Sequence, residues 1–118
     1  MEIITHQNGN NRIAEVTSGE ILIRQADDAL QLFMDLYYQD FNGIILHERN
    51  ITPEFFDLKT GLAGEVLQKC STYQVRLAIV GDFSGYPGKS LRDFIYESNK
   101  GRLVNFLDTV EAAVSKAR

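Results

Sequence analysis

The sequence predicts an α/β domain with the order β-β-α-β-α-β-α-β-α, in which helices pack on a mixed sheet. Two short apolar runs, at residues 44–46 and 75–80, are typical of strands that are buried on both faces. Between such runs, apolar residues recur every three or four positions, which is the period of one helix face. At 118 residues, without repeats or low-complexity linkers, the chain 1–118 is expected to form one domain.

The beginning of the chain predicts a β-hairpin followed by a helix. Residues 3–5 and 12–17 are β-like, and the Asn-Gly-Asn-Asn sequence at 8–11 tolerates positive φ. Residues 19–23 fit either a third short strand or the start of a helix. Residues 26–37 predict the first helix, because its apolar face recurs at Ala26, Ala29, Leu30, Phe33, Met34 and Tyr37.

The rest of the chain continues the alternation. Thr52-Pro53 predicts the start of a short helical segment that Thr52 caps. Ser90 predicts the start of a later helix, with Asp93 completing a capping box and Lys100-Gly101 ending the helix. We also expect helices over 62–70 and 110–117, a loop at 81–89 and a last strand at 103–107.

The composition argues against several classes of protein. Twelve basic and 16 acidic residues give a formal charge of −4, which argues against a nucleic-acid partner. No apolar stretch is long enough to span a membrane and the amino terminus lacks a signal-peptide pattern, so we expect a cytoplasmic location and no membrane partner. Cys70 is the only cysteine, which excludes an internal disulfide and a four-cysteine zinc site.

Two polar connections, at 47–61 and 81–90, follow predicted parallel strands. Sheets of this type place their binding sites at the carboxyl ends of such strands. The aromatic residues Phe55, Phe56, Phe83 and Tyr86 lie in these connections and would form an anchor for a partner if exposed, or a roof over the core if buried. The residues that we expect to bind a partner or ligand are Asp57, Thr60, Gly61, Asp82, Phe83, Tyr86, Lys89, Ser90 and Arg92.

His47 and Glu48, with Asp57, are weak candidates for acid–base catalysis, because His47 follows the buried strand at 44–46. The alternative is a loop histidine that caps a carbonyl or pairs with a carboxylate. His6 is the only other histidine, so a site with several histidine ligands is not expected. Acidic residues in such connections more often cap helices than bind a cation, so we predict no metal and no cofactor.

The loop at 81–90 resembles a phosphate-binding P-loop only at its end. Gly88-Lys89-Ser90 fits the motif, but Phe83 occupies the position that the first glycine requires. A weaker anion site, made by the helix start with Lys89 and Arg92, remains open.

The element order resembles the STAS/SpoIIAA-like fold of anti-sigma factor antagonists. Three matches carry this resemblance: the initial hairpin, the final VNFLDTVEAAV segment, and the FDLKTGL segment at 56–62. The last is similar to the segment in which family members carry a serine that a partner kinase phosphorylates. The resemblance implies that Thr60 occupies the phosphorylated position, with Gly61 after it and Asp57 as its acidic neighbour. One extra residue separates Asp57 from Thr60, and threonine replaces serine.

Over nearly the whole chain, the segments ITPEFFDLKTGLAGE, LAIVGDFSGY and KSLRDFIYESNKGR are similar to a bacterial family known as domain of unknown function 4180. That resemblance implies a small cytoplasmic protein and no particular activity.

Three functional hypotheses follow. The first is a non-enzymatic regulatory domain of STAS-like type that binds another protein through residues 47–65 and 81–93. The second is a protein that binds a small anion or nucleotide in the same crevice. The third is an enzyme that uses His47 with nearby carboxylates. Small sheets of this kind often form dimers, so a homodimer is an open alternative.

Overall fold

The computed structural model of the chain describes residues 1–116 and confirms the predicted α/β class and element order. Five strands form one sheet in the order β1-β2-β3-β4-β5, with β1 and β2 antiparallel and the other neighbours parallel. The elements are β1 Glu2–Asn8, β2 Asn11–Thr17, α1 Ala26–Tyr38, β3 Gly43–His47, η1 Glu48–Asn50, η2 Pro53–Phe56, η3 Leu58–Thr60, α2 Leu62–Tyr73, β4 Arg76–Val80, α3 Lys89–Lys100, β5 Val104–Leu107 and α4 Val110–Lys116.

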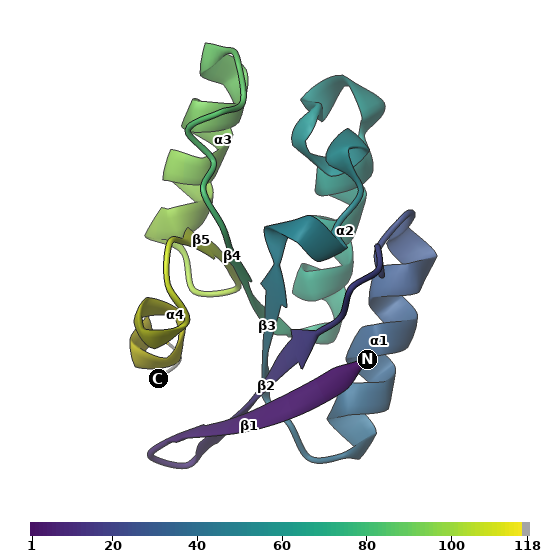
Figure 1. The fold of residues 1–118 in the computed structure, drawn as a ribbon, viewed down its shortest axis with the longest axis vertical. Coiled ribbons are helices and arrows are strands. Elements are labelled where there is room, and N and C mark those ends of the chain that lie inside the picture. The colour runs from purple at the N-terminus through teal and green to yellow at the C-terminus, as the bar shows by residue number, and fades with distance from the viewer. Residues whose placement is uncertain (117–118) are drawn as a thin grey trace.

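Helices cover the two faces of the sheet unequally. Helices α1, α2 and α3 pack on one face, and the short helix α4 lies on the other (Figure 1). The large core lies under the three helices and includes Phe33, Leu46, Ile79 and Phe106. The smaller core under α4 consists of four buried residues, Ile13, Ile45, Val80 and Ala113. The predicted contribution of Ala117 to this face lies outside the described residues.

The chain after β2 forms no third strand. Ile23 makes an isolated parallel bridge to Ile51 instead. The backbone N–H groups of Leu22 and Ile23 donate to the carbonyl of Asn50, and the Asn50 side chain donates to the carbonyls of Ser18 and Glu20, at 2.8 Å each. Asn50 therefore fixes the chain after β2 against the connection that follows β3.

The buried face of α1 is rotated from the predicted one. Leu32 and Leu36 are buried, whereas Tyr37 is 66% exposed. Both stripes share Ala26, Ala29 and Phe33, so the 3.6-residue period allowed either. The observed stripe buries two leucines and leaves the tyrosine hydroxyls of the last turn in water, which avoids an unpaired buried hydroxyl.

Two predicted caps, at Ser90 and at Thr52, are wrong in detail. Helix α3 begins one residue early, at Lys89, and its N-cap is Gly88 with φ of 100°. This backbone conformation suits glycine, and no side chain caps the helix. Before α4, the Thr109 hydroxyl accepts the N–H of Ala112. Thr52 precedes η2 without making a side-chain cap bond.

The sheet edge at β5 is closed by side chains of α3. The backbone N–H groups of Leu77 in β4 and of Gly81 after β4 donate to the carbonyls of Leu103 and Leu107. The backbone N–H and carbonyl of Phe106 therefore point away from β4. The Asn99 amide donates to the Phe106 carbonyl at 3.0 Å and accepts its N–H at 2.7 Å. The Ser98 hydroxyl donates to the carbonyl of Val104. Asn99 thus occupies the hydrogen-bonding position of a sixth strand.

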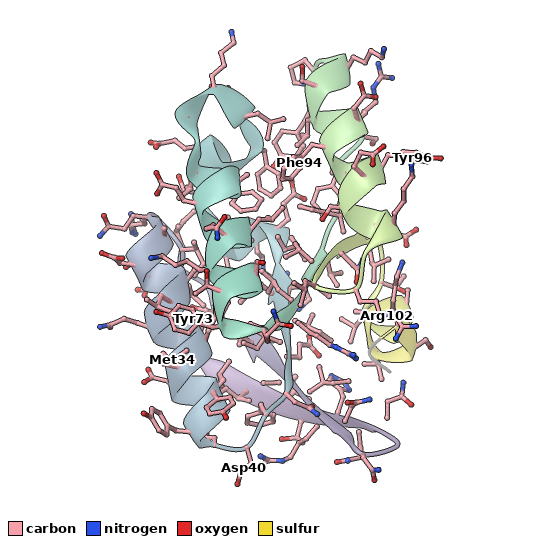
Figure 2. The ribbon with its side chains drawn as sticks, turned by 180° about the vertical axis from the view of Figure 1, so that it is seen from behind. Met34, Asp40, Tyr73, Phe94, Tyr96 and Arg102 are labelled. Atoms are coloured by element: carbon pink, nitrogen blue, oxygen red, sulfur yellow. The ribbon has the colours of Figure 1, made fainter. Side chains whose placement is uncertain are left out.

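We expect Asn99→Ala to lower the free energy of unfolding by about 1–3 kcal/mol, because both backbone groups of Phe106 lose their partner. Urea denaturation measures the effect. Tyr96→Ala, at a position of the same helix whose side chain points away from the sheet (Figure 2), is the matched control and should change the free energy of unfolding by about 0.5 kcal/mol or less. Equal effects of the two substitutions would contradict this role of Asn99.

Candidate functional site

A groove lies at the carboxyl ends of β3 and β4, where the connections after these strands meet. Its volume is about 610 Å³. The turns η2 and η3 form one wall, and the start of α3 forms the other, at the same end of the molecule (Figure 1). The lining residues are Pro53, Phe56, Asp57, Leu58, Lys59, Tyr86, Pro87, Gly88, Ser90 and Leu91. Three residues predicted for binding, Asp57, Tyr86 and Ser90, line the groove directly, and a fourth, Lys89, lies between the lining residues Gly88 and Ser90.

The aromatic residues of the two connections roof the core and do not form an exposed anchor. Phe55 and Phe56 are buried, at 1% and 5% exposure, and Phe83 and Tyr86 are half-buried. Tyr86 stacks on Phe56 with ring centroids 4.7 Å apart, and Phe83 lies 5.8 Å from Phe56. The rings therefore hold the two connections together, and the groove opens above Phe56 and Tyr86.

A hydrogen bond from Tyr86 to Glu48 joins the same two connections. The Tyr86 hydroxyl donates to the Glu48 carboxylate. Burial, together with this carboxylate, raises the pKa of Tyr86, so the phenol stays protonated and remains a donor. Gly81 lies against Glu48, and a Cβ at Gly81 would come within 2.6 Å of the Glu48 Cβ. Glycine at this position lets the strand end approach Glu48 closely.

Thr60, Asp57 and Gly61 build the turn that precedes α2. The Thr60 hydroxyl lies 2.8 Å from the carbonyl oxygen of Glu54 and 2.9 Å from that of Asp57, and it accepts the Leu62 N–H. The Asp57 carboxylate accepts the N–H of Lys59. Gly61 has φ of +79°, a left-handed conformation that favours glycine. Thr60 is exposed, and its hydroxyl proton is shared by two carbonyls of the loop beside the groove.

The other charged candidates stand in solvent near the groove. Asp82 accepts the backbone N–H and the hydroxyl of Ser84, and these hydrogen bonds hold the pKa of Asp82 below its usual value. Lys89 lies 4.0 Å from Asp93, with both side chains exposed. Arg92 is also exposed. Charge pairs this exposed contribute little to stability, so these side chains are available to a ligand.

A second cluster of polar residues centres on Glu15, which sequence reasoning missed. Its carboxylate bridges both histidines, with one oxygen 2.8 Å from His6 Nε2 and the other 2.8 Å from His47 Nε2. Glu15 is only 8% exposed. Burial raises the pKa of Glu15, but the hydrogen bonds and charges of the two histidines outweigh burial and lower it overall. The signal was present, because Glu15 interrupts the otherwise apolar run Ile13-Ala14-Glu15-Val16 of β2.

The three weak catalytic candidates do not converge. His47 bonds to Glu15, Glu48 accepts from Tyr86, and Asp57 stabilises the turn before α2. His47 does not line the groove. Within residues 1–116, no group of three or more His, Cys, Asp or Glu residues is placed to hold a metal ion.

Comparison with known proteins assigns the chain to a family. A family model described as a domain of unknown function (DUF4180) matches residues 8–117. The chain belongs to the DUF4180 family. A search of curated proteins finds no significant match. The family match begins at the last residue of β1 and includes both walls of the groove.

None of the helices in the described part of this DUF4180 chain is long and apolar enough to cross a membrane.

We expect Glu15→Gln to lower the free energy of unfolding by about 1–3 kcal/mol near neutral pH, because two partly buried imidazoles lose a charged acceptor. The pKa of Glu15 is depressed in the folded state, so the ionised carboxylate stabilises the fold above the ordinary value of 4.5, and this contribution disappears as the pH falls through the folded-state pKa. The difference between wild type and variant should therefore shrink in acid. Urea denaturation across the acidic range measures it.

Glu65→Gln, the same substitution at an exposed position of α2, is the control and should leave the pH dependence unchanged. A difference between wild type and Glu15→Gln that stays constant in acid would contradict the role of the Glu15 charge.

Proposed function

We propose that this DUF4180 chain is a non-enzymatic interaction domain of STAS-like type that binds a partner protein in the groove. The observation that carries the proposal is the groove itself, since a hollow of about 610 Å³ opens where two connections meet at the carboxyl edge of the parallel strands. The initial antiparallel hairpin followed by parallel strands supports the STAS-like assignment.

The lining favours an extended peptide segment with apolar side chains. Pro53, Phe56, Leu58, Pro87 and Leu91 supply apolar surface on both walls. Asp57 and Lys59 add charges of opposite sign at one wall. A partner with an apolar anchor and flanking polar groups would fill this lining, as in other peptide-binding grooves.

Regulation through Thr60 is part of the proposal. The hydroxyl of Thr60 bonds to the loop that forms one wall, so a phosphate there would break the bonds to Glu54 and Asp57 and add charge beside the groove. Thr60→Glu places a negative charge at the same position and should change the affinity for the partner.

The groove is tested with a displayed library of peptides from the host proteome, selected on the wild-type protein. We expect Leu58→Glu to raise the Kd for the purified peptides by at least about tenfold, because a carboxylate replaces an apolar lining group. Isothermal titration calorimetry measures the affinity. Tyr38→Glu, at an 82% exposed position at the end of α1, is the control and should bind normally.

Selected peptides that bind wild type and Leu58→Glu equally would refute the groove as the binding site. An affinity that Thr60→Glu leaves unchanged would refute the regulatory part alone.

A second candidate function, anion binding, is favoured by the start of α3. Helix α3 begins at the groove without a side-chain cap, so its first N–H groups have no side-chain acceptor, and Lys89 and Arg92 lie beside them. We expect phosphate or a nucleotide to shift the amide resonances of residues 89–91 in a nuclear magnetic resonance titration. Lys89→Ala and Arg92→Ala should each weaken this binding. Resonances that do not move at millimolar ligand would remove this candidate.

A further inference from the structure

We propose that strand β1 is the interface of a homodimer, in which two copies pair their β1 strands antiparallel about a two-fold axis, with Ile4 opposite Ile4 of the second copy. The two sheets would then form one continuous sheet. This inference does not depend on the groove, because β1 is an edge strand and the groove lies between the connections after β3 and β4.

The two edges of the sheet differ in how their backbone groups are paired. At β5, Ser98 and Asn99 pair the outward groups of Val104 and Phe106. At β1, no side chain of residues 1–116 hydrogen-bonds to the backbone of residues 2–7. An edge strand whose outward N–H and carbonyl groups are not bonded by side chains can pair with a strand of another chain. The chain thus closes one edge with its own side chains and leaves the other open.

The sequence of β1 lacks most of the features that usually block an edge, and its one carboxylate, Glu2, lies at the start of the strand. Glu2–Asn8 reads EIITHQN, without lysine, arginine or proline. Its register with β2 runs without interruption from Glu2 opposite Thr17 to Asn8 opposite Asn11, so no bulge bends the strand away. Residues 2–7 therefore offer a regular edge to which no side chain of residues 1–116 hydrogen-bonds.

The side chains of β1 select a second copy as the occupant. Pairing strands about a two-fold axis keeps each face of the sheet continuous, so residues of the same face must oppose each other. With Ile4 on the axis, Glu2 lies opposite His6 of the second copy and Ile3 lies opposite Thr5. This register places the Glu2 carboxylate against the His6 imidazole, whose Nε2 also bonds to Glu15, and no two residues of like charge lie directly opposite each other.

Ile4 itself supports this register over the neighbouring one. Ile4 is 44% exposed, one of the large apolar side chains that the single chain leaves in water. A register centred on Thr5 would place Ile4 opposite His6 and leave Glu2 opposite Asn8. Only the register centred on Ile4 covers apolar surface with apolar surface and pairs Glu2 with His6.

The oligomeric state of the full chain tests the proposal by light scattering after size exclusion, across the micromolar concentration range. We expect the wild type to have twice the mass of one chain. Ile4→Lys should raise the dimer dissociation constant by at least about tenfold, because it places like charges directly opposite each other. Tyr38→Lys makes the same kind of change at an exposed position of α1 and should remain dimeric.

Disulfide formation tests the register. Ile4→Cys should form a disulfide between copies on mild oxidation, because the two positions oppose each other, whereas Thr5→Cys should not. Cys70 does not interfere, since it is buried and burial raises the pKa of its thiol to about 12. Cross-linking at Thr5 in place of Ile4 would overturn the register.

Hydrogen exchange of the wild type gives a measurement that needs no variant. Amides in residues 2–6 should become more protected as the protein concentration rises. A wild type that stays monomeric would overturn the proposal. So would a dimer that Ile4→Lys does not weaken and whose formation does not protect the amides of residues 2–6. Neither result bears on the proposed peptide binding in the groove, because that proposal is tested by measuring peptide affinity.

Discussion

The parallel pairing of β2, β3, β4 and β5 is the constraint on which the rest of the structure depends. Parallel neighbours must be joined by crossovers, so the carboxyl ends of these strands lie side by side at one end of the sheet, and the connections begin there. The connections after β3 and β4 therefore lie side by side although they are far apart in the sequence, and the stacked rings of Phe56 and Tyr86 join them. The groove is a consequence of topology first and of side-chain chemistry second.

The parts of the fold that depend on local pattern could be predicted from the sequence. The apolar runs of β3 and β4 and the helical periods after them fix the element order, and the parallel order then places residues 47–61 beside 81–90. Predictions failed where two structures fit the same apolar period or the same residue type equally well. The stripe of α1 could include Tyr37 or Leu36, and only the packing of the whole sheet decides between them.

The Glu15 cluster could not be predicted from spacing, because its three members come from three strands. His6 and Glu15 meet because β1 pairs antiparallel with β2, and His47 reaches the same carboxylate because β3 pairs parallel with β2. A charged residue inside an apolar strand indicates a buried partner, but not which one. The histidine that seemed a catalytic candidate thus has a carboxylate partner that its own neighbourhood in sequence does not contain.

The unequal covering of the two sheet faces explains why polar residues gather where they do. Three helices cover one face, whose residues in β3, β4 and β5 are apolar, whereas α4 has seven residues and covers the other face in part. Beyond α4 that face needs groups that tolerate water, and the paired His6, Glu15 and His47 provide them while their hydrogen bonds still tie three strands together. Ile4 lies on the same face, beside His6 in β1 and next to the open edge. No partner within residues 1–116 buries Ile4 fully, and this exposed apolar side chain supports our proposal that a second copy pairs with the edge of β1.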